Sequence, residues 1–90
     1  MPDAPFDSAC RYELDPKVAL RPEPFGALAY HYGSRRLTFL RSKLLAEVVS
    51  GLGGYESADA ALADRVPVSS RPAYQRALAN LARSEFIRAC

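Results

Sequence analysis

The residue types that carry acid–base, nucleophilic or metal chemistry are few in this sequence, and they do not cluster. There is one histidine, His31, and the two cysteines, Cys10 and Cys90, lie near opposite ends of the chain. That spacing does not fit a zinc site. The sequence also lacks a nucleophile elbow, a phosphate-binding loop and a dinucleotide-binding glycine motif. It therefore predicts a protein that is not an enzyme and that holds no metal or cofactor.

Arginine is the residue type that does recur in a pattern. One group frames a short apolar run, and a second group is spaced along a predicted helix. The members are Arg35, Arg36 and Arg41 in the first group and Arg71, Arg76 and Arg83 in the second. A soluble basic surface explains this pattern without any partner. Two binding functions also fit it: contact with DNA phosphates through the helix, or capture of an acidic peptide beside the apolar run.

DNA binding would make the chain a small winged-helix protein that uses the helix predicted at residues 72–84. Beside its arginines that helix offers Ala73, Ala77 and Asn80, a set poor in side chains that read base edges. The 12 basic and 10 acidic residues give a formal net charge of +2, which supplies few phosphate contacts. Peptide capture is therefore the leading hypothesis, and we expect no nucleic-acid partner.

The elements that position these residues follow from the hydrophobic periodicity. Leu28, Tyr30 and Tyr32 alternate with small residues, a pattern typical of a strand. Gly33-Ser34 suits a two-residue type II′ hairpin turn before the next apolar run. The predicted strands are residues 18–21, 27–32 and 36–40, and they form a three-stranded antiparallel meander.

After residue 41 the period changes to that of helices. Ser42 and Ser57 are good N-caps, and Pro72 suits the first helical position because its missing N–H would be unpaired there anyway. The predicted helices cover residues 43–49, 58–64 and 72–84. Phe86-Ile87 forms either a last short strand or a C-terminal hydrophobic clasp. A run of strands followed by a run of helices predicts an α+β fold.

Composition limits the number of domains and the location. Ninety residues form one domain, which we expect over residues 11–90, after a flexible tail of residues 1–10. Apolar residues make up 49% of the chain, which is too many for a disordered protein. The longest uncharged run, Pro24–Ser34, is too short to cross a membrane, and no secretory signal follows Met1. We therefore expect a cytoplasmic protein with no membrane partner.

The third predicted strand is the last of the meander, and nothing later in the sequence clearly covers it. An uncovered edge strand presents unpaired N–H and C=O groups. An extended peptide can add to such an edge as a further strand, with the third helix as the opposite wall of a groove. The sequence therefore favours strand addition on residues 36–40.

The stretch Pro16–Arg41 reads PKVALRPEPFGALAYHYGSRRLTFLR. It resembles the signature of the mycofactocin biosynthesis peptide chaperones, VALRPEPFGAL followed by YH[FY]G[ST]R[RK]L[ST]FL. An LLAEVV helix and a C-terminal YxxALxxLA helix extend the resemblance. It implies a RiPP recognition element, similar to the pyrroloquinoline-quinone peptide chaperones, with a winged-helix-like fold of three strands and three helices.

The same resemblance implies a function and partners. Such a protein binds the leader of the ribosomally made mycofactocin precursor peptide, in the cleft between the third strand and the third helix. It then presents the peptide to a radical S-adenosylmethionine maturase, which would carry the iron–sulfur chemistry. The residues assigned to peptide binding are Arg35, Arg36, Leu37, Thr38, Phe39 and Leu40 on the strand and Ala73, Tyr74, Ala77, Asn80 and Leu81 on the helix.

Two details of this assignment stay open at the level of the sequence. One arrangement of the strand packs Leu37 and Phe39 into the core with Leu44 and Val48, leaving Arg36 and Thr38 outward. On the helix, Gln75 with Ala82 is the alternative wall. The density of the signature in the turn before residue 26 also suggests a contact with the enzyme, made by Arg21, Glu23 and Phe25.

Overall fold

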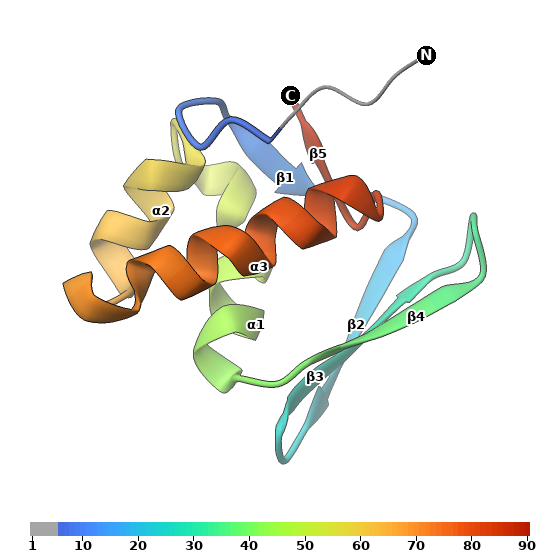
Figure 1. Ribbon diagram of the computed structural model, residues 1–90. Coiled ribbons are helices and arrows are strands. Elements are labelled where there is room, and N and C mark those ends of the chain that lie inside the picture. The colour runs from blue at the N-terminus through green and yellow to red at the C-terminus, as the bar shows by residue number, and fades with distance from the viewer. Residues whose placement is uncertain (1–5) are drawn as a thin grey trace.

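The computed structural model describes residues 6–90, and within them strands precede helices along most of the chain (Figure 1). The strands are β1 (Tyr12–Leu14), β2 (Val18–Glu23), β3 (Gly26–His31), β4 (Arg36–Leu40) and β5 (Ile87–Ala89). The helices are α1 (Lys43–Ser50), α2 (Ala58–Arg65) and α3 (Arg71–Arg83), with short 3₁₀ turns at Leu52–Gly54 and Val68–Ser70. The predicted α+β fold, a three-stranded antiparallel sheet followed by three helices, is confirmed.

The main sheet has the order β2-β3-β4, and both pairs are antiparallel. Ala29 of β3 lies opposite Leu20 of β2 and Thr38 of β4. Because successive side chains of a strand point to opposite faces, Ala27, Ala29 and Leu40 share one face and are buried. The strands observed are those predicted, with β2 two residues longer and β3 one residue earlier.

The hairpin between β3 and β4 differs from the prediction. The last residue pair is His31 with Arg36, so the connection holds four residues instead of the two expected. Gly33 does not take a positive φ, as a type II′ turn requires, whereas Arg35 has a φ of 62°. The wider loop lets the N–H of Ser34 donate to Nδ1 of His31 at 3.1 Å. A Cβ at residue 33 would lie 2.8 Å from that imidazole, so Gly33 serves a close approach.

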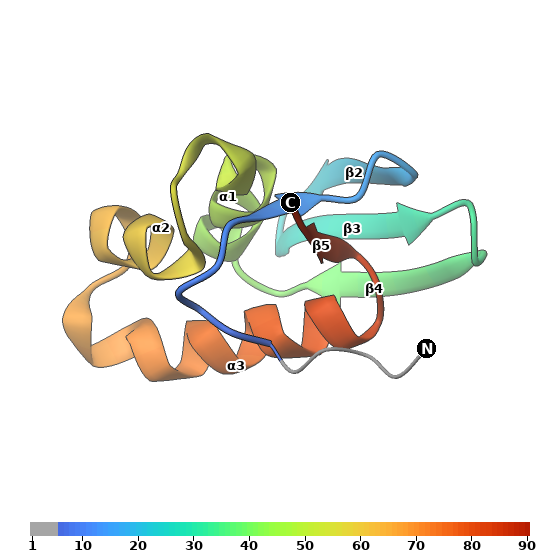
Figure 2. The ribbon, with the colours of Figure 1, turned by 90° about the horizontal axis from the view of Figure 1, so that it is seen from above.

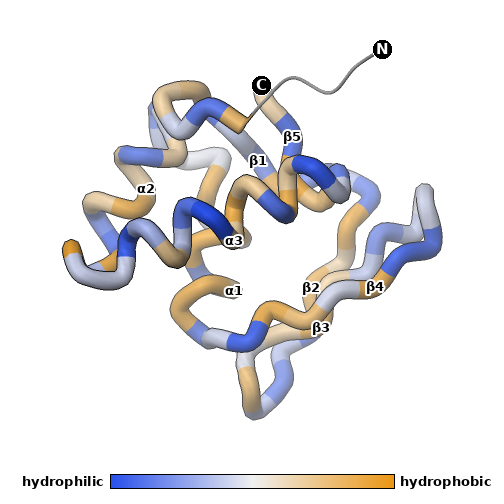
Figure 3. Tube along the Cα trace, viewed as in Figure 1, coloured by the Kyte–Doolittle hydropathy of each residue, from blue (hydrophilic) through white to orange (hydrophobic). Residues whose placement is uncertain are grey.

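Helices α1 and α2 begin directly after serines whose side chains cap them. The N–H of Leu45 donates to Oγ of Ser42 at 3.1 Å, and the N–H of Ala60 donates to Oγ of Ser57 at 3.0 Å. Pro72 lies in the first turn of α3, where a missing N–H breaks no helical bond. Apolar and polar residues alternate along α3 (Figure 3), and its buried side chains are Leu78 and Leu81. Each helix therefore presents an apolar stripe to one shared core.

The two ends of the described chain meet in a second, two-stranded sheet, which the sequence did not predict. Tyr12 of β1 lies opposite Ala89 of β5, and the strands are antiparallel. This confirms the strand alternative for the C-terminal segment. Within the predicted tail, residues 1–5 lie outside the described residues. Residues 8–10 contact the start of α2, where Ala58 and Asp59 donate backbone N–H groups to the carbonyls of Cys10 and Ser8 at 3.0 and 2.9 Å.

We predict that Ser42→Ala lowers the free energy of unfolding by about 1–2 kcal/mol, because it removes the N-cap of α1. It also removes a link between helices, since the hydroxyl oxygens of Ser42 and Tyr74 lie 2.7 Å apart in a hydrogen bond. Urea denaturation followed by circular dichroism measures the loss. Ser50→Ala is the control, because that exposed hydroxyl bonds only to the carbonyl of Glu47 in its own helix. An equal loss in both variants would contradict the prediction.

Candidate peptide-binding groove

The outer edge of β4 is open. Among residues 6–90, β4 forms backbone hydrogen bonds with β3 and with no other segment. Figure 2 shows β4 at the margin of the sheet, with α3 running alongside it. The strand contains no proline, so each of its residues keeps both backbone polar groups. The expectation of an uncovered third strand in the meander is therefore confirmed for the described chain.

A groove of about 210 Å³ lies between β4 and α3. Its lining residues are Thr38, Phe39, Leu40, Leu45, Ala77, Asn80, Leu81, Ser84 and Phe86. The walls combine a small apolar side chain, Ala77, with the amide of Asn80 and the hydroxyls of Thr38 and Ser84. Such a mixture of apolar surface and a few polar groups is typical of a binding site.

Packing behind the groove holds its two walls in place. Leu40 and Phe86 are each only 2% exposed and fix the strand and the chain end that follows α3. The N–H of Phe86 donates to the carbonyl of Leu81 at 2.9 Å, which turns the chain back after α3. The ring of Phe86 lies edge-on to the imidazole of His31, with ring centres 5.8 Å apart. The groove therefore rests on the core and does not depend on a surface loop.

The structure brings together about half of the residues that the sequence assigned to peptide binding. Those in the groove are Thr38, Phe39, Leu40, Ala77, Asn80 and Leu81. Sequence reasoning missed Leu45, Ser84 and Phe86. A signal for Ser84 existed, because it follows Asn80 by four residues and Leu81 by three, which places it on the same helical face. No local pattern marks Leu45 or Phe86, which reach the groove only through packing.

The other predicted residues lie elsewhere. Tyr74 bonds to Ser42 and so joins α3 to α1, and Ala73 is exposed outside the groove lining. Arg35, Arg36 and Leu37 are exposed and do not line the groove either. Backbone atoms of residues 36 and 37 still belong to the open edge of β4, so a guest strand would reach them without contacting their side chains.

The arrangement that packs Leu37 and Phe39 into the core is wrong. Their side chains are 59% and 56% exposed, whereas Leu40 is buried. A strand offers two faces, and Leu40 shares its face with Thr38. Because Leu40 packs in the core cluster with Val48, Leu37 and Phe39 must occupy the opposite face.

The basic side chains near the two walls of the groove differ in whether they already bind another part of the protein. Arg35, Arg36 and Arg41 are exposed around β4. On α3, Arg71 donates to the backbone carbonyls of Val66 at 2.8 Å and Ala63 at 3.1 Å. It therefore satisfies carbonyls at the end of α2 and does not face a ligand. No observation in the described chain favours the DNA-binding hypothesis.

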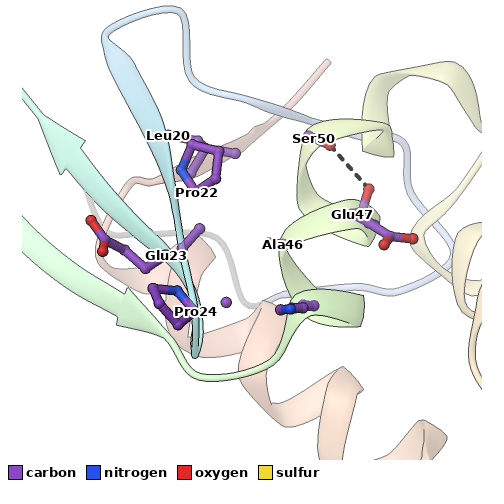
Figure 4. A pocket seen from close by; sticks show the side chains of 10 residues that line it. Leu20, Pro22, Glu23, Pro24, Ala46, Glu47 and Ser50 are labelled. Carbon is purple, nitrogen blue, oxygen red and sulfur yellow. Dashed lines mark hydrogen bonds between the residues drawn. The ribbon is translucent and has the colours of Figure 1, made fainter.

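A second groove, of about 550 Å³, lies at the opposite edge of the sheet between β2 and α1. In Figure 4, Pro22 and Pro24 lie across from Ala46, Glu47 and Ser50 of α1. Pro22 lies within β2 and has no N–H to offer a further strand. The edge of β2 is therefore less suited to strand addition than the edge of β4, although its groove is larger.

The histidine and the two cysteines, which are the side chains most suited to chemistry, do not lie in surroundings typical of a catalytic site. His31 is 6% exposed, accepts a hydrogen bond from Ser34 and packs against Phe86. Cys10 and Cys90 are free and exposed. The carboxylate of Asp7, beside Cys10, raises the pKa of that thiol above its ordinary value, which lowers its reactivity. Over residues 6–90, no three His, Cys, Asp or Glu side chains are grouped so as to hold a metal ion.

None of the helices within residues 6–90 combines the length and apolar character needed to span a bilayer.

A small α+β domain with an open edge strand beside a shallow groove belongs to the class of domains suited to hold an extended chain. The protein belongs to the Peptide chaperone MftB family, whose model matches residues 11–88. The predicted resemblance is therefore confirmed, and so is the prediction that the protein is not an enzyme.

Curated relatives support the same family. The chain is 41% identical over 83 residues to Peptide chaperone MftB of Mycolicibacterium smegmatis, covering 91% of this chain and 81% of the relative. It is 40% identical over 83 residues to Peptide chaperone MftB of Mycobacterium ulcerans, covering 91% and 76%. A shorter match to Peptide chaperone MftB of Mycobacterium tuberculosis is 50% identical over 50 residues, covering 56% and 46%. No solved structure matches the chain.

Proposed function

We propose that this peptide chaperone binds the leader of the ribosomally made mycofactocin precursor by strand addition on β4 and presents it to a radical S-adenosylmethionine maturase. The observation that carries the proposal is the open edge of β4 beside the groove formed with α3. Main-chain hydrogen bonds to β4 would supply affinity, and alternate side chains of the guest would enter the groove and supply selectivity.

The composition of the groove supports a guest in extended conformation. Ala77 on α3 leaves room for a guest side chain at the helix surface. Asn80, Ser84 and Thr38 offer hydrogen-bonding groups to polar atoms that the guest would otherwise bury without partners. The groove is short, so a few leader residues would fill it.

Charge supports an acidic leader. Arg35, Arg36 and Arg41 are exposed around the edge of β4, and no carboxylate within residues 6–90 lies in salt-bridge contact with them. A leader with Asp or Glu near this edge would associate faster and would bind more weakly as salt screens the arginines.

The chemistry of maturation would belong to the enzyme partner. The chain has two cysteines, too few to ligate an iron–sulfur cluster. Both cysteines are free, which fits action in the reducing cytoplasm. In this proposal Arg21, Glu23 and Phe25 lie on the side that meets the enzyme.

Binding of a labelled precursor leader, measured by fluorescence anisotropy together with amide hydrogen exchange, tests the proposal. We expect saturable one-to-one binding that weakens between about 50 and about 500 mM salt, because the Debye length falls over that range from about 14 Å to about 4 Å. On binding, amides of Arg36–Leu40 that face away from β3 should gain protection. Absence of saturable binding, or protection that falls on β2 and spares β4, would contradict it.

A further inference from the structure

The face of the main sheet opposite the core carries an apolar patch. Its members alternate with the core-facing residues of β3 and β4, joined by one residue of the preceding turn: Phe25, Leu28, Tyr30, Leu37 and Phe39. Leu28 lies opposite Phe39, and Tyr30 lies opposite Leu37. The ring of Phe25 packs edge-on against Phe39, with ring centres 5.7 Å apart. We call this set the outer patch. Leu28 is half-buried and the other four members are exposed, and a contiguous apolar surface of this kind marks an interaction site.

Two arginines, Arg21 and Arg41, border the outer patch. Arg21 lies in the same cross-strand row as Leu28, and Arg41 lines a hollow of about 360 Å³ with Phe25 and Phe39. Residues 17–41 hold five basic residues and one acidic residue, Glu23, whereas the whole chain has a net charge of +2. The single carboxylate is already paired, since Nε of Arg21 lies 2.7 Å from Oε2 of Glu23. The positive charge of the chain is therefore concentrated around this sheet.

We propose that the outer patch is the docking surface for the enzyme that receives the leader, and that the enzyme meets it with an apolar surface ringed by carboxylates. This inference rests on the proposed function. Apolar side chains at the centre and opposite charges at the rim are the usual anatomy of a protein interface. A second copy of this chain fits poorly, because two such faces would bring Arg21 and Arg41 of both copies together, while the nearby Glu23 is already paired with Arg21.

Strand addition on β4 would couple leader binding to docking of the enzyme on the outer patch. A guest strand on β4 alternates its side chains between the groove and the outer face of the sheet. Its outward side chains would lie beside Leu37 and Phe39, so they would extend the outer patch. An enzyme docked there would contact the chaperone and the leader at once. We therefore expect the leader to increase the affinity of the enzyme for the chaperone, and the enzyme to increase the affinity of the leader by the same factor.

The test measures binding of the purified maturase to the labelled chaperone, with and without precursor leader. Tyr30→Thr and Arg21→Glu change β3 and β2, away from the open edge of β4. We expect each to weaken maturase binding at least tenfold and to change leader binding less than twofold. Val68→Thr is the matched control, because that side chain is 72% exposed but lies on the 3₁₀ turn before α3. It should leave both affinities unchanged.

The outcomes separate this inference from the proposed function. Wild-type protein that binds no leader would overturn the proposed function. In that case, the affinities of the wild type and the variants for the maturase, measured without leader, would still test the docking surface. Leader binding that persists in all variants, with maturase binding unaffected by Tyr30→Thr and Arg21→Glu, would overturn the docking surface alone. Dimerisation of the wild type that Tyr30→Thr abolishes would assign the patch to a second copy and would also overturn it.

Discussion

Ala77→Phe is expected to lower leader affinity about 100-fold, which corresponds to about 2.7 kcal/mol. Ala77 lies on α3 and lines the groove opposite Thr38 and Leu40. A phenyl ring at this position would fill much of a space of about 210 Å³, so a guest side chain could no longer enter. The effect is as large as the loss of a central interface residue. Fluorescence anisotropy with a labelled leader measures it.

The same substitution at another alanine supplies the control. Ala63 is exposed on α2 and does not line the groove, so Ala63→Phe should leave the affinity within twofold. Both variants should retain the wild-type circular dichroism spectrum, because neither alanine is fully buried. Undiminished leader binding in Ala77→Phe would show that the leader binds outside this groove.

Gly26→Ala is expected to lower the free energy of unfolding by at least about 3 kcal/mol. Gly26 has a φ of 149°, which L-residues rarely adopt, and it is buried at the start of β3. A Cβ there would overlap the carbonyl oxygen of Leu40 and would lie 2.8 Å from the backbone nitrogen of Ser42. Both obstacles are backbone atoms, which cannot move without separating β3 from the end of β4. Urea denaturation measures the loss, and recovery of only unfolded protein would agree with it.

Gly54→Ala is the matched control for Gly26→Ala. A Cβ at Gly54 would meet no atom within 4 Å, and its φ is not in the positive range. Its unfolding free energy should therefore stay within about 1 kcal/mol of the wild type, with a small gain from the less flexible unfolded chain. Equal losses in the two variants, or a loss below about 1 kcal/mol in Gly26→Ala, would contradict the steric argument.

Local rules predicted the elements well, because their causes act over a few residues. The hydroxyls of Ser42 and Ser57 cap the helices that follow them, as their sequence positions indicate. The hairpin at Gly33 was predicted less well. Its glycine suited a two-residue turn, but the observed loop holds four residues and packs closely against the ring of His31. Turn preferences describe the backbone of the turn residues and do not include packing of the loop against a nearby side chain such as His31.

The residues of the groove could be predicted from the sequence only in part. The sequence identified the strand and the helix that form its walls, together with Ala77 and Asn80. It did not identify Leu45 or Phe86, because these residues enter the groove from α1 and from the chain after α3. The pairing of β1 with β5 was also missed, since it joins Tyr12 to Ala89 across nearly the whole chain. Contacts between distant segments leave no periodic signal in either segment.

The order of residues was enough to establish the family signature over residues 16–41, the strand-then-helix order and the absence of grouped catalytic side chains. Tertiary packing decided which face of β4 is buried. Alternation divides a strand into two faces but does not say which one meets the core. Burial of Leu40 in the core cluster that also holds Val48 settles that choice and turns Leu37 and Phe39 outward. The outer patch exists because the helices cover only one side of the sheet.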